Sequence, residues 1–158
     1  MTDRADNISR LNQLCEKHRV LLVYLFGSQK HAGLKYLHEH NIHNEQNVHI
    51  EKTSDLDIGI LLENPPASMY KFHGDLYLNL SAIFEPFNID MIFFHEVSYL
   101  LKFDIIKGHR IYAADEELAD EYEEKVMKFA SDLSFKRKMF EKDFLEALEN
   151  GYFEIELK

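Results

Sequence analysis

Blocks of hydrophobic and polar residues along the chain predict a mixed α/β domain. The runs VLLVYLF (20–26) and LDIGILL (56–62) are apolar at consecutive positions, which is typical of strands buried on both faces. A third run, NIDMIFF (88–94), places its apolar residues alternately and carries Asp90 on the opposite face. The segment HRIYAA (109–114) is short and predicts a last strand.

Helical spacing of apolar residues separates these strands. A helix is expected from Ile8 onward with Asn7 as its N-cap, and others over 70–84 and 98–106. Residues 115–150 contain neither Gly nor Pro, and their apolar residues recur every three, four or seven positions, which predicts one long helix or two with a bend. We therefore expect an α/β (α+β) fold: a mixed sheet with flanking helices and a long C-terminal helix.

The length of 158 residues fits a single domain over 1–158, with a core at about 8–114 and a helical extension over 115–150. Residues 30–54 read as a polar insertion, partly helical around 34–40, and hold five of the nine histidines. The apolar stripe of the C-terminal helix either packs on the core or is covered by a partner helix, and a homo-oligomer is compatible with it.

Charge and cysteine content narrow the classes of function. The net charge is −10, with 18 basic and 28 acidic residues, which disfavours stable nucleic-acid binding. Cys15 is the single cysteine, so no intrachain disulfide forms, and its place in the helical pattern predicts a buried thiol. No apolar run is long enough to span a membrane. A cytoplasmic protein is expected.

Three carboxylates are candidates for metal-dependent chemistry. Asp55 and Asp57 lie two apart at the start of a strand, so both point to one face, where a divalent cation such as Mg²⁺ would offset their repulsion. If Asp90 lies on a neighbouring strand, the three converge and can hold metal ions and accept a proton. The alternatives are a solvated Ser-Asp turn and an Asp90 that faces water at a strand end.

Gly27 and Ser28, which follow the first strand, are further candidates for the functional site. A turn without a Cβ at Gly27, with a hydroxyl at Ser28 and free backbone N–H groups, can bind phosphate oxygens. Ordinary turn chemistry also favours the same two residues.

Taken in order, LFGSQ, SDLDIGILL, NIDMIFF and LLKFDIIKGHRIYAADEE resemble the DNA polymerase β-like nucleotidyltransferase superfamily, most closely its minimal members. The resemblance extends over about residues 8–124. It implies that Gly27 and Ser28 hold a nucleoside triphosphate. It also implies that Asp55 and Asp57 bind Mg²⁺, and that Asp90 completes a second metal site and helps to activate an acceptor hydroxyl. The implied substrate is ATP, attacked at its α-phosphate.

The chain departs from this pattern in two places. Ser28 and Asp55 are separated by 26 residues, many more than in minimal members, and the Ala-Arg-Gly that usually follows Gly-Ser is replaced, with His31 where a phosphate-binding Arg often falls. Lys30 or Lys35 can compensate, or both are solvated charges. A zinc site in the insertion is the less favoured alternative to a surface loop, because no familiar ligand spacing appears; its histidines are His31, His38, His40, His43 and His49.

The resemblance implies an enzyme that transfers AMP from ATP to a hydroxyl. Small members similar to this chain commonly act as antitoxins that adenylylate a tyrosine of a HEPN-type toxin, and we expect such a partner here. One alternative is an aminoglycoside-type small-molecule acceptor. Another is a catalytically weak binding module that neutralises its partner by contact through the C-terminal helix.

Overall fold

Four strands form one sheet in the order β3-β2-β1-β4 in the computed structural model, which describes residues 6–39 and 54–151. Strand β1 pairs antiparallel with β2 and β4, whereas β2 and β3 pair in parallel. The last residues of β1 and the first residues of the other three strands therefore lie at the same end of the sheet, which we call this edge below. The strands are β1 (Val20–Phe26), β2 (Leu56–Leu62), β3 (Ile89–Phe93) and β4 (His109–Ala113).

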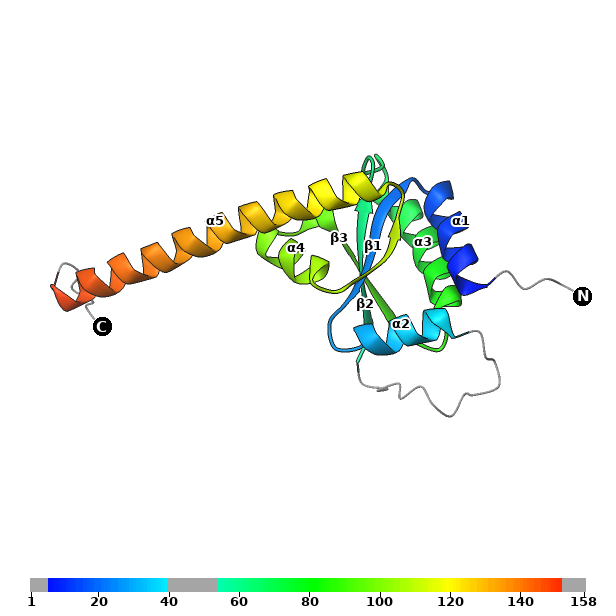
Figure 1. Ribbon diagram of the computed structural model, residues 1–158, viewed down its shortest axis with the longest axis horizontal. Coiled ribbons are helices and arrows are strands. Elements are labelled where there is room, and N and C mark those ends of the chain that lie inside the picture. Colours follow the sequence, from blue (N-terminus) through cyan, green and yellow to red (C-terminus); the bar gives the residue numbers. More distant parts are fainter. Residues whose placement is uncertain (1–5, 40–53, 152–158) are drawn as a thin grey trace, which may run out of the picture.

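Helices cover both faces of this sheet (Figure 1). One buried cluster joins α1, α2 and α3 to one face, through residues such as Leu11, Leu37 and Leu80. A second cluster joins α4 and α5 to the other face and contains Tyr24, Ile105 and Ala119. The helices are α1 (Asn7–Lys17), α2 (Lys30–His38), α3 (Met69–Ile83), η1 (Phe94–Glu96), α4 (Tyr99–Ile106) and α5 (Glu116–Glu149).

The predicted mixed sheet and long C-terminal helix are confirmed, and the two buried strands have the predicted bounds. The N-cap of α1 is Asp6 rather than Asn7, because the Asp6 carboxylate accepts the N–H of Ser9 at 2.6 Å. Cys15 is buried as predicted, and burial raises the pKa of its thiol to about 12.

Helix α2 differs more from its prediction. It begins at Lys30, directly after the Gly-Ser turn, rather than around Leu34. Its sequence has weak helical patterning, but Leu37 is buried in the core and Leu34 packs against it, so packing on the sheet stabilises the helix. The rest of the predicted insertion, residues 40–53, lies outside the described residues.

Helix α5 is one continuous helix of 34 residues, without the alternative bend. Only Ala119, Val126 and Ala130 on it are buried, and Figure 1 shows its C-terminal part extending well beyond the sheet. Neither α5 nor any other helix in the described parts of the chain is long and apolar enough to cross a membrane.

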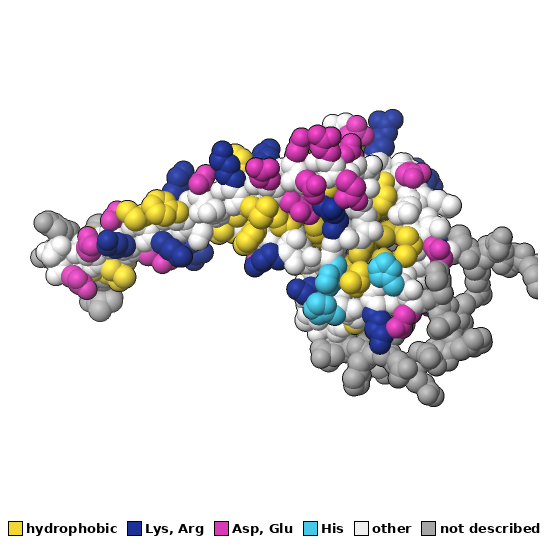
Figure 2. Space-filling view, viewed as in Figure 1, with side chains coloured by type: hydrophobic (Ala, Val, Ile, Leu, Met, Phe, Trp, Pro, Cys, Tyr) yellow, Lys and Arg dark blue, Asp and Glu magenta, His cyan; other side chains and the backbone are white. Residues whose placement is uncertain are grey.

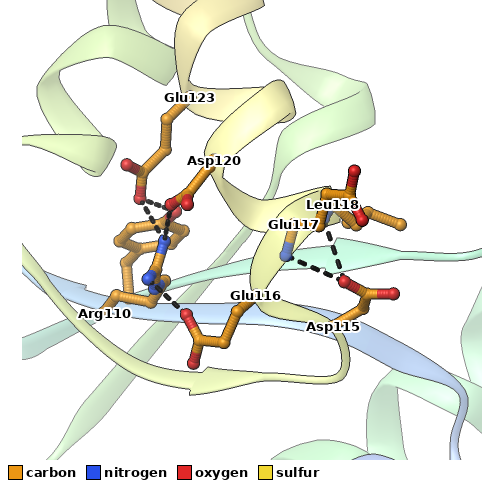
Figure 3. A network of polar contacts seen from close by, with 8 residues as sticks. Arg110, Asp115, Glu116, Glu117, Leu118, Asp120 and Glu123 are labelled. Atoms are coloured by element: carbon orange, nitrogen blue, oxygen red, sulfur yellow. Dashed lines mark hydrogen bonds and ion pairs between the residues drawn. The ribbon is translucent and has the colours of Figure 1, made fainter.

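A network of ion pairs attaches the start of α5 to the sheet (Figure 3). Arg110 on β4 donates to Glu116 at 2.6 Å and to Glu123 at 3.0 Å, and Asp120 lies 3.5 Å away. The hydroxyl of the fully buried Tyr24 donates to the same Glu123 oxygen at 2.6 Å. Partial burial alone would lower the pKa of Arg110, but Glu123 and Glu116 raise it. The acidic residues Glu116, Asp120 and Glu123 therefore hold the start of α5 against β4.

Replacing Arg110 should destabilise the fold. Arg110→Ala is expected to lower the free energy of unfolding by about 2 kcal/mol, because Glu123 stays partly buried without its cation. Arg137→Ala is the matched control: that side chain is 71% exposed and pairs with Glu141 one turn along the helix, so its loss should cost less than about 0.5 kcal/mol. Urea unfolding followed by circular dichroism measures both, and equal losses would contradict the role of Arg110.

Candidate active site

At the end of β1, the Gly-Ser turn formed by Gly27 and Ser28 lies against the carboxylate of Asp57 on β2. Gly27 has φ of +75°, a conformation that favours glycine, and a Cβ added there would collide with Oδ2 of Asp57. Phe26, the residue before the turn, is the register partner of Asp57 on β2. The two motifs that are far apart in sequence are thus in contact in the fold, and glycine is required where they meet.

Asp57 also lies beside the second strand carboxylate. It is the register partner of Asp90 on the parallel strand β3, so the two side chains leave the same face of the sheet. Asp57 is half-buried, and burial raises the pKa of its carboxyl, with further contributions from the negative charges of Asp90 and Asp55. The fold thus holds carboxylates that repel one another close together, and a bound cation would relieve this repulsion.

Asp55 and Asp90 are the other two predicted carboxylates, and the charges of both act on Asp57. Asp55 precedes β2 and is exposed, and Asp90 is exposed rather than buried, because it lies at the second position of an outer strand. Across residues 6–39 and 54–151, no three His, Cys, Asp or Glu side chains form a group that could hold a metal ion. The oxygen donors suit Mg²⁺, which binds through one or two carboxylates and fills its other positions with water and phosphate oxygens.

The start of α2 extends the turn into an anion-binding feature. The helix begins two residues after Ser28, so the positive end of its dipole lies at the Gly-Ser turn, where the N–H of Lys30 donates to the Gly27 carbonyl at 3.5 Å. Lys30 is half-buried in the first turn. Lys35, the other candidate from the sequence, is exposed and lies 3.7 Å from Glu39, so the structure favours Lys30 over Lys35.

His109, which the sequence analysis did not single out, lies at the start of β4 and at this end of the sheet. It is the register partner of Leu25 on β1, and its Nε2 lies 2.9 Å from Nδ1 of His31 on α2. Partial burial lowers the pKa of His109, as do the charges of His31 and Lys30. The pairing of β4 with β1 creates this contact, and the only signal in the sequence was a histidine at the start of a predicted strand.

The zinc alternative gains no support from the described part of the chain. His31 pairs with His109, and His38 lies at the other end of α2. The remaining histidines of the predicted insertion, His40, His43 and His49, lie outside the described residues.

Comparison with known proteins places this site in a family. The sequence model of the family described as polymerase beta, nucleotidyltransferase matches residues 9–117, which include every candidate residue of the edge. No curated protein matches the sequence.

Solved structures share the fold at low sequence identity. One is a toxin-antitoxin crystal structure with AMP-PNP, at 15% identity and a TM-score of 0.59, covering 88% of this chain and 98% of the other. Another is a tri-AMPylated HEPN toxin from Shewanella oneidensis in complex with its MNT antitoxin, at 15% identity and a TM-score of 0.56, covering 88% and 96%. A MntA-HepT toxin-antitoxin structure matches with the same identity and TM-score, covering 88% and 97%. With its matching sequence, its mixed sheet and this arrangement of turn and carboxylates, the chain belongs to the polymerase β nucleotidyltransferase family.

Proposed function

We propose that the protein transfers AMP from ATP to a hydroxyl of a partner protein, with Mg²⁺ as cofactor. The observation that carries the proposal is the position of Asp57, which lies against Gly27 of the turn and in register with Asp90. A triphosphate held at the turn then has its α-phosphate next to the carboxylates. Family membership supports nucleotidyl transfer as the class of reaction.

In the proposed reaction, the acceptor oxygen attacks the α-phosphorus of ATP. The bond from that phosphorus to the bridging oxygen breaks, pyrophosphate leaves, and Asp90 accepts the proton of the acceptor hydroxyl. Asp55, Asp57 and Asp90 would each supply carboxylate oxygens to bound Mg²⁺, and water and the phosphate oxygens of ATP would supply the remaining ligands. When bound, such ions stabilise the entering and the departing oxygens. The exposure of Asp90 suits its role, because the acceptor must reach it from outside.

We assign triphosphate binding to Gly27, Ser28, the first N–H groups of α2 and Lys30. Turn and helix amides give oriented donors without a side chain. Lys30 adds a positive charge at a site that lacks the usual arginine, and His31 with His109 adds two ring nitrogens beside it.

The proposed acceptor is a tyrosine of a HEPN-type toxin. Support comes from the solved structures of the same fold, which are toxin-antitoxin complexes, one of them with a tri-AMPylated HEPN toxin. The competing proposal is neutralisation by contact alone, which the unusual sequence GSQKHAG after the first strand favours.

A direct test incubates the protein with Mg²⁺, ATP and a HEPN-type toxin, and weighs both chains by intact mass spectrometry. The partner should gain the mass of one or more AMP groups, and Asp57→Asn should abolish that gain, because it removes a ligand charge at the centre of the site. Asp104→Asn is the matched control, since Asp104 is an exposed aspartate on α4 paired with Lys107, and it should leave the gain unchanged. Neutralisation of the partner without any mass change would instead establish the contact mechanism.

The raised pKa of Asp57, caused first by burial and then by the charges of Asp90 and Asp55, predicts a conflict between stability and activity. The folded-state pKa of Asp57 is raised, so the wild type loses stability as pH rises through the carboxyl range and the group ionises beside Asp90. Without Mg²⁺, Asp57→Asn should therefore be more stable than the wild type at pH 8, and the difference should disappear below about pH 4. Thermal unfolding at both pH values measures this.

Added Mg²⁺ should stabilise the wild type and not Asp57→Asn, because only the wild type keeps the full set of carboxylates. A variant that is less stable than the wild type at pH 8 would show that Asp57 is a structural rather than a strained functional residue.

Substituting each of the two lysines of α2 in turn distinguishes a phosphate-binding side chain from an ordinary surface charge. Lys30→Ala should raise the KM for ATP about tenfold with a smaller change in kcat, because a charge-assisted contact to the triphosphate is lost. Lys35→Ala, on the same helix, should change neither constant. Initial rates over a range of ATP concentrations decide, and equal effects of the two substitutions would remove Lys30 from the site.

A further inference from the structure

His31 and His109 form a pair of rings beside the candidate phosphate-binding turn. Nε2 of His109 lies 2.9 Å from Nδ1 of His31, and the ring centroids are 4.8 Å apart. His31 belongs to the first turn of α2, whereas His109 is the register partner of Leu25, which lies two residues, or about 7 Å, before Gly27. Figure 2 shows histidine side chains gathered over α2. The pair therefore lies where the start of α2 meets the end of β1.

Both rings project from elements that are packed against the sheet. A Cβ added at Gly108 would collide with the backbone oxygen of Leu25, so the chain touches β1 immediately before it reaches His109. His31 is exposed, but it belongs to a helix whose Leu37 is buried in the core. The positions of α2 and β4 thus bring the two rings together.

The contact limits the number of protons that the pair can carry. A hydrogen bond between two ring nitrogens uses one proton, which belongs to one of them. When both rings are neutral, one of the outer nitrogens, Nδ1 of His109 or Nε2 of His31, is therefore protonated and the other is bare. One added proton makes both outer nitrogens N–H donors and gives the pair a single positive charge. A second added proton would break the hydrogen bond, because both contacting nitrogens would then be donors.

The surroundings of the pair oppose the added proton in the free protein. Partial burial lowers the pKa of His109, and the positive charges of His31 and Lys30 lower it further. The register partner of His109 on β1 is uncharged. Other charged residues that flank the pair along the chain are already in ion pairs; they are Lys35, with Glu39, Lys107, with Asp104, and Arg110, with Glu116 and Glu123. His109 is therefore neutral at pH 7 in the free protein.

We propose that the His31–His109 pair takes up one proton when the triphosphate binds, and holds its β- or γ-phosphate through the resulting N–H groups. This proposal rests on the proposed function, which places the α-phosphate at the carboxylates and leaves the other two phosphates to extend toward α2. Their negative charge offsets that of Lys30, so the proton that the free protein disfavours is stabilised in the complex. The proton comes from solvent, and no covalent bond to phosphorus changes.

Proton uptake makes the affinity for the nucleotide depend on pH. Between the pKa of the free pair and the higher pKa of the bound pair, the affinity falls as pH rises, by up to about tenfold per pH unit for one proton. Below and above this range the affinity is constant. An arginine, the residue expected at position 31 from the family resemblance, is charged at every pH and would give no such dependence.

Calorimetric titration of the full chain with AMP-PNP and Mg²⁺ measures this proton. In buffers of different ionisation enthalpy at pH 7.5, the observed heat changes in proportion to the number of protons taken up. The wild type should take up about 0.5 to 1 proton more than the variant His31→Gln, His109→Gln, whose amides cannot be protonated. Ionisation of AMP-PNP contributes equally to both. His38→Gln is the matched control, since His38 is exposed at the other end of α2, and it should behave as the wild type does.

His31→Arg separates the charge from the proton. At pH 8.5 it should bind AMP-PNP about tenfold more tightly than His31→Gln, and with less proton uptake than the wild type, because the guanidinium is already charged. Circular dichroism shows whether each variant folds, and single changes at the exposed His31 keep the test valid if the double variant does not. Equal proton uptake by the wild type and the glutamine variants would overturn this proposal and leave nucleotide binding intact. A wild type that does not bind AMP-PNP would overturn the proposed function as well.

Discussion

The close approach of Asp57 to Gly27 is the constraint on which the site depends. It requires a glycine at the end of β1, because that residue has positive φ and leaves no room for a Cβ beside the carboxylate. It also fixes the phosphate-binding turn relative to β2, and through the register of β2 with β3 it fixes Asp90. This one contact thus sets the distance between the turn that would hold the triphosphate and the carboxylates that would act on it.

This constraint explains why the separation of the motifs in sequence matters little. Antiparallel pairing of β1 with β2 places the end of β1 beside the start of β2. The length of the segment that connects the two strands is therefore free to vary. The strands could be predicted, because buried apolar runs and turn residues are local signals, whereas a shared site for Gly27 and Asp57 was implied only by the resemblance to nucleotidyltransferases. The start of α2 could not be predicted, because Lys30 to Gly33 have little helical pattern and the helix is stabilised by packing on the core.

Two further features depend on the fold rather than on local sequence. The His31–His109 contact exists because β4 pairs with the far side of β1, and no spacing in the sequence connects those residues. The ion pairs of Arg110 with Glu116 and Glu123 likewise exist because β4 lies beside the start of α5, which no local pattern in the sequence indicates. The sequence left open whether Asp90 faces water, because the exposure of a strand depends on whether that strand is the outermost one of the sheet.

The central claim is that the turn and the carboxylates form one nucleotide site around Asp57. A crystal structure of the protein with Mg²⁺ and a non-hydrolysable ATP analogue tests it most directly. The account predicts the phosphates at Gly27, Ser28 and the start of α2, with Mg²⁺ between them and the carboxylates of Asp55 and Asp57. A nucleotide bound elsewhere, or bound with Asp57 turned away from the metal, would contradict it.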